Sequence, residues 1–167
     1  MRRTALNIIP MTGAHLPACR RIVARSEPWK TLGESVDFLR AMAGRQSYVC
    51  LRDREVAGFV VFTPEPVFAR GGYLRAIGVE PDMRGRRIGR TLLAFAEAAT
   101  ARKAPNLFLC ASSFNRGAQA FYRKCGFVRV GRIEGLLRKG AAEIIYWKRL
   151  RRPARRQNAL RTPGRKI

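Results

Sequence analysis

The chain has 167 residues, 47% of them hydrophobic, which suits one folded domain and argues against a wholly disordered polymer. Lysine and arginine total 34 against 11 aspartate and glutamate residues, and the formal net charge of +23 predicts attraction to anions such as nucleic acid, ribosomes or phosphorylated ligands. Because 28 of the 34 basic residues are arginine, a bias in the coding sequence explains the excess equally well.

Cysteine and histidine usage argues against disulfides, metal sites and histidine-based catalysis. The four cysteines are far apart with no Cys-x-x-Cys pair, as expected for reduced thiols, and His15 is the only histidine. No apolar run approaches the roughly 20 residues that span a bilayer, and the N-terminal segment lacks a signal-peptide core. We therefore expect a cytoplasmic protein with no bound metal and no membrane span.

The N-terminal third predicts a strand and two helices. Leu6 to Pro10 has a strand pattern, and Gly13 to Arg25 carries apolar residues at helical spacing. A second helix is expected from Glu34 to Met42, where apolar residues recur on one side. Pro28 and Trp29 interrupt the helical pattern and predict an aromatic-bearing loop between the two helices.

Three strands are predicted next. Ser47 to Leu51 and Val56 to Phe62 are rich in β-branched and aromatic residues, and they indicate an antiparallel hairpin. Pro64 and Pro66 are expected to end the second of these strands, because proline has no N–H to donate to a sheet. Gly72 to Val79 predicts the third strand.

The remaining elements alternate between helix and strand. Ile88 to Arg102 has the most regular helical pattern in the chain. Shorter segments predict a strand, a helix and two strands, in the order Leu107 to Ala111, Gly117 to Lys124, Phe127 to Ile133 and Glu143 to Leu150. The strand-helix-strand-helix-strand middle favours neighbouring parallel strands, whereas the hairpin is antiparallel, so we expect an α/β fold around a mixed sheet.

The end of the chain has a different composition. Residues 151–167 carry seven basic residues and no acidic ones, with two prolines and a glycine. This composition predicts a flexible basic tail, which leaves residues 1–150 as a single domain.

A basic turn precedes the helix that begins at Ile88. The turn carries four arginines and two glycines: Arg84, Gly85, Arg86, Arg87, Gly89 and Arg90. Helix N-termini bear the positive end of the helix dipole and unpaired N–H groups, so clustered arginines there repel the dipole and one another. A bound polyanion reverses that effect, and the glycines let it approach the backbone amides. We expect an anion site; a solvated basic turn is the alternative.

Two stretches of the sequence resemble the GNAT superfamily of N-acetyltransferases. Ile77 to Leu93, IGVEPDMRGRRIGRTLL, resembles the acetyl-CoA signature of that family, and Asn115 to Phe127, NRGAQAFYRKCGF, looks like its downstream helix and strand start. The pattern Arg/Gln-x-x-Gly-x-Gly/Ala maps onto Arg84, Arg87 and Gly89, so that Arg87 replaces the middle glycine. The resemblance implies a central, mostly antiparallel sheet with one splayed parallel pair of strands, flanked by about four helices.

The resemblance also implies how acetyl-CoA is held as the acetyl donor. Ile77 and Val79 would offer strand backbone to the pantetheine arm, and the amides from Arg84 to Arg90 would hold the pyrophosphate. Asn115 would bind the pantetheine region. Tyr122 would lie near the thioester sulfur and protonate the departing thiolate after a neutral amine attacks the carbonyl; a tyrosine of the pocket wall with no proton role is the alternative.

The resemblance supplies no general base. Cys110 occupies the place where some relatives that acetylate protein N-termini have a glutamate, and we expect it to be a buried core residue and not a nucleophile. Glu80 and Glu65, at predicted strand ends, are the acidic candidates, with Ser112 or Ser113 as possible holders of a proton-conducting water. Either glutamate could equally serve only to end its strand.

For the acceptor-binding side of the cleft, the sequence offers candidates only by residue type. Trp29 resembles the aromatic residues that line the acceptor cleft of relatives, although a tryptophan after proline is as often a packing residue; Tyr73 and Glu134 are further contacts of the same kind. We expect acetyl transfer to a protein N-terminus, a lysine or a small amine, by a monomer or homodimer. The alternative is a CoA-binding protein of this fold that contacts nucleic acid or ribosomes nonspecifically through its basic tail.

Overall fold

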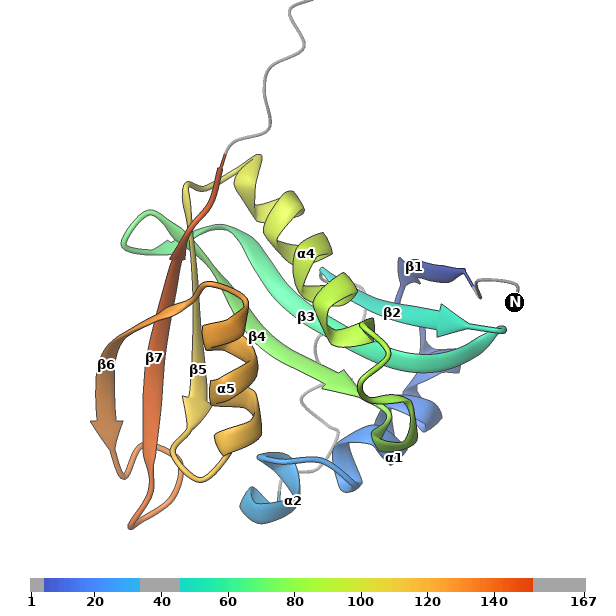
Figure 1. The fold of residues 1–167 in the computed structure, drawn as a ribbon, viewed down its shortest axis with the longest axis horizontal. Coiled ribbons are helices and arrows are strands. Elements are labelled where there is room, and N and C mark those ends of the chain that lie inside the picture. Colours follow the sequence, from blue (N-terminus) through green and yellow to red (C-terminus); the bar gives the residue numbers. More distant parts are fainter. Residues whose placement is uncertain (1–4, 34–45, 152–167) are drawn as a thin grey trace, which may run out of the picture.

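The computed structural model describes residues 5–33 and 46–151, and across these ranges seven strands form one sheet with helices on both faces (Figure 1). The strand order is β1-β2-β3-β4-β5-β7-β6. The strands are β1 (Leu6–Pro10), β2 (Ser47–Arg52), β3 (Glu55–Phe68), β4 (Gly71–Val79), β5 (Asn106–Ser112), β6 (Val128–Glu134) and β7 (Ala142–Arg149). The helices are α1 (Leu16–Ala24), α2 (Trp29–Leu32), α4 (Ile88–Ala101) and α5 (Arg116–Lys124), with short 3₁₀ turns at Gly13–His15 and Pro81–Met83.

One pair of neighbouring strands in the described sheet is parallel, and it separates along its length. β4 pairs with β5 only from Gly71 to Leu74, opposite Asn106 to Leu109. β4 then continues to Val79 and β5 to Ser112, and Figure 1 shows them diverging. The other strand pairs are antiparallel. The expected α/β fold with a mixed sheet and a splayed parallel pair is confirmed.

The sheet is packed on both faces by apolar side chains. Val60 and Phe62 of β3 join a cluster with α4 and α5, whereas Phe59 and Val61 join a second cluster with α1 and Trp29. This alternation follows from the two-residue repeat of a strand. The core thereby fixes the positions of α4 and α5 beside the diverging ends of β4 and β5.

The elements predicted within the described residues are confirmed, with two differences. β3 runs to Phe68, past Pro64 and Pro66, which were expected to end it. Its pairing with β4 is irregular between Thr63 and Phe68, so no regular ladder there needs the N–H groups that the prolines lack. Trp29 begins a short helix instead of lying in a loop. The predicted helix from Glu34 to Met42 and the tail beyond residue 151 lie outside the described residues.

Residues 5–33 and 46–151 contain no helix that is both long and apolar enough to span a membrane.

Candidate active site

A cleft of about 1180 Å³ opens where β4 and β5 diverge. Its walls come from the α1–α2 region, the end of β4, the basic turn, the end of β5 and the start of α5. Leu136, Leu137 and Glu143, from the turn between β6 and β7 and the start of β7, complete the lining. The cleft therefore gathers segments that are distant in sequence at the gap in the sheet.

One wall of the cleft is the free edge of β4. Beyond Leu74 this edge has lost its β5 partner, so backbone groups of Ile77 and Val79 that face away from β3 have no strand partner there. Both residues line the cleft. An unpaired strand edge can hydrogen-bond an extended ligand, as the sequence predicts for these two residues.

The basic turn ends in an unusual backbone conformation at Arg87. This residue caps α4 with φ of +65°, and Gly85 has φ of +76°. Both angles lie in the left-handed region that favours glycine. A Cβ added at Gly85 would meet no atom within 4 Å, so the space beside this turn is open to a ligand.

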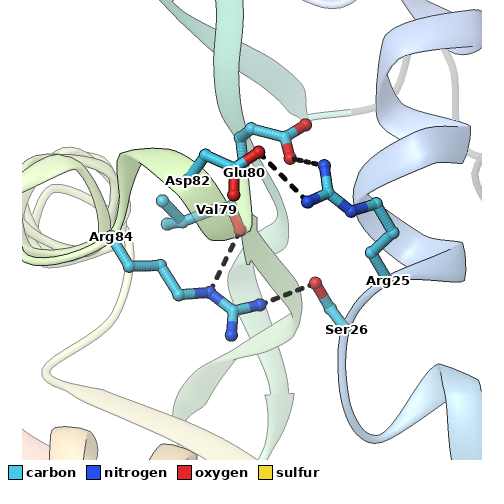
Figure 2. A network of polar contacts seen from close by, with 6 residues as sticks. All are labelled: Arg25, Ser26, Val79, Glu80, Asp82 and Arg84. Atoms are coloured by element: carbon cyan, nitrogen blue, oxygen red, sulfur yellow. Dashed lines mark hydrogen bonds and ion pairs between the residues drawn. The ribbon is translucent and has the colours of Figure 1, made fainter.

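The side chains of the turn point in different directions. The Arg84 guanidinium donates to the Ser26 hydroxyl at 2.7 Å and to the Val79 carbonyl at 3.4 Å (Figure 2). Arg84, Arg87 and Arg90 line the cleft, whereas Arg86 is exposed and is not part of the lining. Arg84 thus ties the turn to the segment after α1.

Glu80 lies outside the cleft lining. Its side chain is 12% exposed, and its carboxylate pairs with the Arg25 guanidinium at 2.6 Å. Arg25 also pairs with Asp82 at 3.1 Å (Figure 2). The structure gives Glu80 the role of joining β4 to the end of α1, and it does not bring this carboxylate to the other candidate residues. Glu65 is exposed on β3 and is also absent from the lining.

Two residues of the downstream motif, Asn115 and Tyr122, face the cleft from α5. Asn115 caps the helix, and its side-chain oxygen accepts from the Ala118 amide at 3.2 Å. Tyr122 is 6% exposed. Burial, with smaller contributions from Tyr73 and Cys125, raises the pKa of Tyr122, so the phenol remains protonated at neutral pH. It can therefore act as a proton donor.

Tyr73 of β4 and Cys110 of β5 both line the cleft, and their side chains are in contact. Cys110 is only partly buried, which corrects the expectation of a buried core residue; the divergence of β4 exposes this end of β5. Burial is the main cause that raises the pKa of both side chains, and each also responds to the other. A neutral thiol is a poor nucleophile, in agreement with the sequence argument.

Trp29 belongs to the core as well as to the cleft. It is 8% exposed and packs on Phe59 with ring centroids 5.7 Å apart. It also contributes to the cleft lining beside Leu32. The exposed Glu134 at the end of β6 is not part of the lining and forms an ion pair with Arg132.

Glu143 is a cleft residue that the sequence argument missed. It is 6% exposed at the start of β7, and the Ser112 hydroxyl donates to its Oε1 at 2.5 Å. In the sequence it is a single acidic residue in the otherwise apolar run AAEIIYW. That signal could have marked it, because a charged residue within an apolar strand is rarely buried without a partner or a task.

The structure brings most of the predicted site residues to one cleft. Those that line it are Trp29, Tyr73, Ile77, Val79, Arg84, Gly85, Arg87, Gly89, Arg90, Asn115 and Tyr122. Arg86, Glu80, Glu65, Glu134 and Ser113 do not line it. In the described part of the chain, no three His, Cys, Asp or Glu side chains are grouped as metal ligands would be.

Solved structures of acetyltransferases share the fold of the chain. The ribosomal-protein-S18-alanine N-acetyltransferase from Escherichia coli is 20% identical with a TM-score of 0.72, over 91% of this chain and 98% of that one. Ard1 from Thermoplasma volcanium is 17% identical with a TM-score of 0.75, over 88% and 99% of the two chains. The ribosomal-protein-alanine N-acetyltransferase from Brucella melitensis is 24% identical with a TM-score of 0.65, over 86% and 99%.

No curated protein matches the sequence. The model of one protein family does match, over residues 16–127, a range that contains α1, the free edge of β4, the basic turn and α5. The match covers well over half of the chain, and the chain belongs to the acetyltransferase (GNAT) family.

Proposed function

We propose that the protein transfers an acetyl group from acetyl-CoA to a primary amine by direct attack within a ternary complex. The observation that carries the proposal is the continuity of the cleft, which runs from the basic turn along the free edge of β4 to Tyr122. Membership of the acetyltransferase family supports the reaction class. The cleft arrangement supports the choice of donor.

The residues at the basic turn suit the diphosphate of acetyl-CoA. Backbone N–H groups at the start of α4 are unpaired by helix geometry, and the open space beside Gly85 leaves room for an anion. Arg87 and Arg90 add positive charge at the cleft. The edge of β4 at Ile77 and Val79 would then hydrogen-bond the pantetheine arm, with Asn115 facing it from α5.

In this arrangement Tyr122 protonates the sulfur that leaves the thioester. Its phenol is buried in the cleft wall and neutral, so it can release a proton as negative charge develops on the sulfur. Trp29 and Tyr73 contribute aromatic surface at the acceptor end. The acceptor is a primary amine: a protein N-terminus, a lysine or a small amine. Two neighbours of the same fold are named for alanine N-acetylation of ribosomal proteins, which makes an N-terminal alanine the first acceptor to test.

The test combines binding and turnover. Acetyl-CoA is titrated calorimetrically into the full chain, and thiol release is then followed with three amines: a peptide with a free N-terminal alanine, a peptide whose only free amine is a lysine side chain, and spermidine. We expect heat of binding and thiol release with at least one amine. If acetyl-CoA produces neither heat nor stabilisation, the proposal is wrong.

The net charge of +23 supports a second, compatible function, nonspecific binding of RNA through residues 151–167. Deletion of these residues would then remove a steeply salt-dependent affinity for single-stranded RNA and leave acetyl-CoA binding unchanged. Equal RNA affinity of the full and truncated chains would contradict this function.

A further inference from the structure

A buried carboxylate lies in the cleft and has no part in the function proposed above. Glu143 stands opposite Ser112 in the antiparallel ladder between β7 and β5. The Ser112 hydroxyl donates to it, and only 6% of the residue is exposed. Removing a carboxylate from water is unfavourable unless partners compensate, so a glutamate is an unusual choice for packing alone. Its place in the cleft lining indicates a chemical task.

The neighbours of Glu143 connect it to Tyr122. Tyr73 of β4 interacts electrostatically with Glu143 and also with Tyr122. Cys110 of β5 interacts with both Glu143 and Tyr73. From β6, the apolar Ile133 is paired opposite Glu143. Tyr73 therefore interacts with both the carboxylate and the proposed proton donor, and all three residues line the cleft.

The other titratable groups near this end of the cleft are poorly suited to accept a proton. Tyr73 and Cys110 have pKa values raised mainly by burial, so both are protonated near neutral pH. Arg75 of β4 also lines the cleft and interacts with Tyr73, but a guanidinium is always charged and accepts no proton. Glu27 is exposed, and its two oxygens accept from the hydroxyl and the amide of Thr31. Among the cleft-lining residues that the structure describes, Glu143 is the buried carboxylate.

We propose that Glu143 is the general base of the acetyl transfer, with Ser112 as the residue that positions its carboxylate. This inference rests on the proposed function and supplies the base that the family resemblance leaves open at Cys110. The acceptor that fits it is an amine that is cationic at neutral pH, since an anionic group in a poorly solvated cleft attracts an ammonium ion.

The step balances as follows. The acceptor enters as an ammonium ion, and Glu143 takes one proton from it. The freed lone pair forms the C–N bond with the thioester carbonyl carbon, and the C–S bond breaks. Tyr122 gives its proton to the departing sulfur, and the second proton lost by the nitrogen returns to the phenolate. Glu143 releases its proton to solvent, so the products are the amide, free CoA thiol and one proton.

The test is the pH dependence of turnover in Glu143→Gln, measured as thiol release with the three amines named above. Glutamine keeps an oxygen for the Ser112 hydroxyl but cannot accept the proton. We expect kcat to fall about 10²- to 10⁴-fold at pH 7, the usual contribution of a general base. The loss should shrink as the pH approaches the pKa of the acceptor amine. It should therefore persist to higher pH for a lysine amine, with a pKa of about 10.4, than for an α-amine near 8.

Two further variants complete the experiment. Glu97→Gln is the control. Glu97 is a partly buried carboxylate that does not line the cleft and whose Oε1 lies 2.7 Å from Lys148 Nζ. This variant should leave the pH profile unchanged. Ser112→Ala should shift the acidic limb of the profile to higher pH, because a donor to the charged form is lost. It keeps the inference testable if Glu143→Gln does not fold.

The outcomes separate the two proposals. A wild-type protein that turns over none of the amines contradicts the proposed function and, with it, this inference. An active wild type with undiminished Glu143→Gln turnover overturns the base alone. A loss in Glu143→Gln that is the same at every pH and for every amine also overturns it, because a purely structural role would produce that pattern.

Discussion

At the scale of single residues, Arg87 departs from the family pattern, and its backbone conformation makes this departure unfavourable. It occupies a left-handed backbone position, with φ of +65°, where the pattern has glycine. A side chain in this region costs on the order of 1 kcal/mol. Its guanidinium also adds positive charge at the positive end of α4.

We therefore expect Arg87→Gly to raise the free energy of unfolding by about 1 kcal/mol, measured by chemical denaturation. Arg86→Gly is the matched control, since Arg86 is a neighbouring exposed arginine without a positive φ. It should leave the free energy of unfolding unchanged or lower it. A loss of stability in Arg87→Gly comparable with that in Arg86→Gly would contradict the strain argument.

Tyr122 allows a prediction about catalysis at the same scale. Tyr122→Phe keeps the ring that packs near Phe127 and Tyr146 and removes the proton. We expect kcat to fall by about 10²-fold or more with little change in acetyl-CoA affinity, measured by thiol release and calorimetry. Because burial raises the pKa of Tyr122, the wild type should retain its proton donor to above pH 10. Full turnover in a folded Tyr122→Phe variant would remove the proton-donor role.

At the scale of elements, the start of α4 depends on close approach to the backbone. A Cβ added at Gly89 would lie 3.5 Å from Phe121 and 3.5 Å from Val79, which is an ordinary contact distance. Alanine therefore fits at this position in the ligand-free fold. The branched side chain of valine has two more methyl groups, and these must extend either into Phe121 or into the cleft. The two substitutions therefore separate tolerance of the fold from access for a ligand.

We expect acetyl-CoA at 100 times its Kd to stabilise the wild type by about 2.7 kcal/mol, which raises Tm by roughly 5 to 10 °C. Gly89→Ala should keep most of this shift, and Gly89→Val should lose it. The measurement is thermal unfolding with and without the ligand. Retention of the full shift in Gly89→Val would show that the diphosphate does not bind at this turn.

The elements also show what the sequence could and could not predict. Periodicity and strand-forming residues were enough for the order of the described elements except the short helix α2, and the two motifs identified residues of the cleft. The extent of β3 was missed because the irregular pairing around Pro64 and Pro66 depends on β4, which follows later in the chain. The apolar run around Glu143 could have marked it as unusual, but its contact with Ser112 arises from the pairing of β7 with β5, about 30 residues away, and no local pattern contains that contact.

At the scale of the whole molecule, the buried thiols and phenols predict a stability that falls in alkaline solution. Burial raises the pKa of Cys19 to about 12, and it also raises the pKa values of Cys50, Tyr73 and Tyr122. In the unfolded chain thiols lose their protons near pH 8.5 and phenols near pH 10. The folded state holds these protons longer, so above pH 8.5 the unfolded state binds fewer protons and stability falls as the pH rises.

We expect the free energy of unfolding to be nearly constant from pH 7 to 8 and to fall above pH 9, by at most about 1.4 kcal/mol per pH unit for each buried thiol, with the phenols adding to the fall only above pH 10. Cys19→Ala removes one of these titrating groups. The free energy of unfolding should therefore fall less steeply with pH in this variant, although its value at neutral pH is lower because the buried side chain is smaller. Denaturation at several pH values measures the slope. Equal slopes in the two proteins would contradict the contribution of Cys19.

The short ladder between β4 and β5 has a mechanical consequence. Among the described residues, four pairs, Gly71 to Leu74 with Asn106 to Leu109, connect the first four strands of the sheet to the last three. A ligand that hydrogen-bonds β4 and contacts α5 would add contacts between the two halves of the sheet, β1 to β4 on one side and β5 to β7 on the other, where β4 and β5 are not paired. Hydrogen exchange of amides in both halves should then slow in concert when the gap is filled, including at positions that the ligand does not touch.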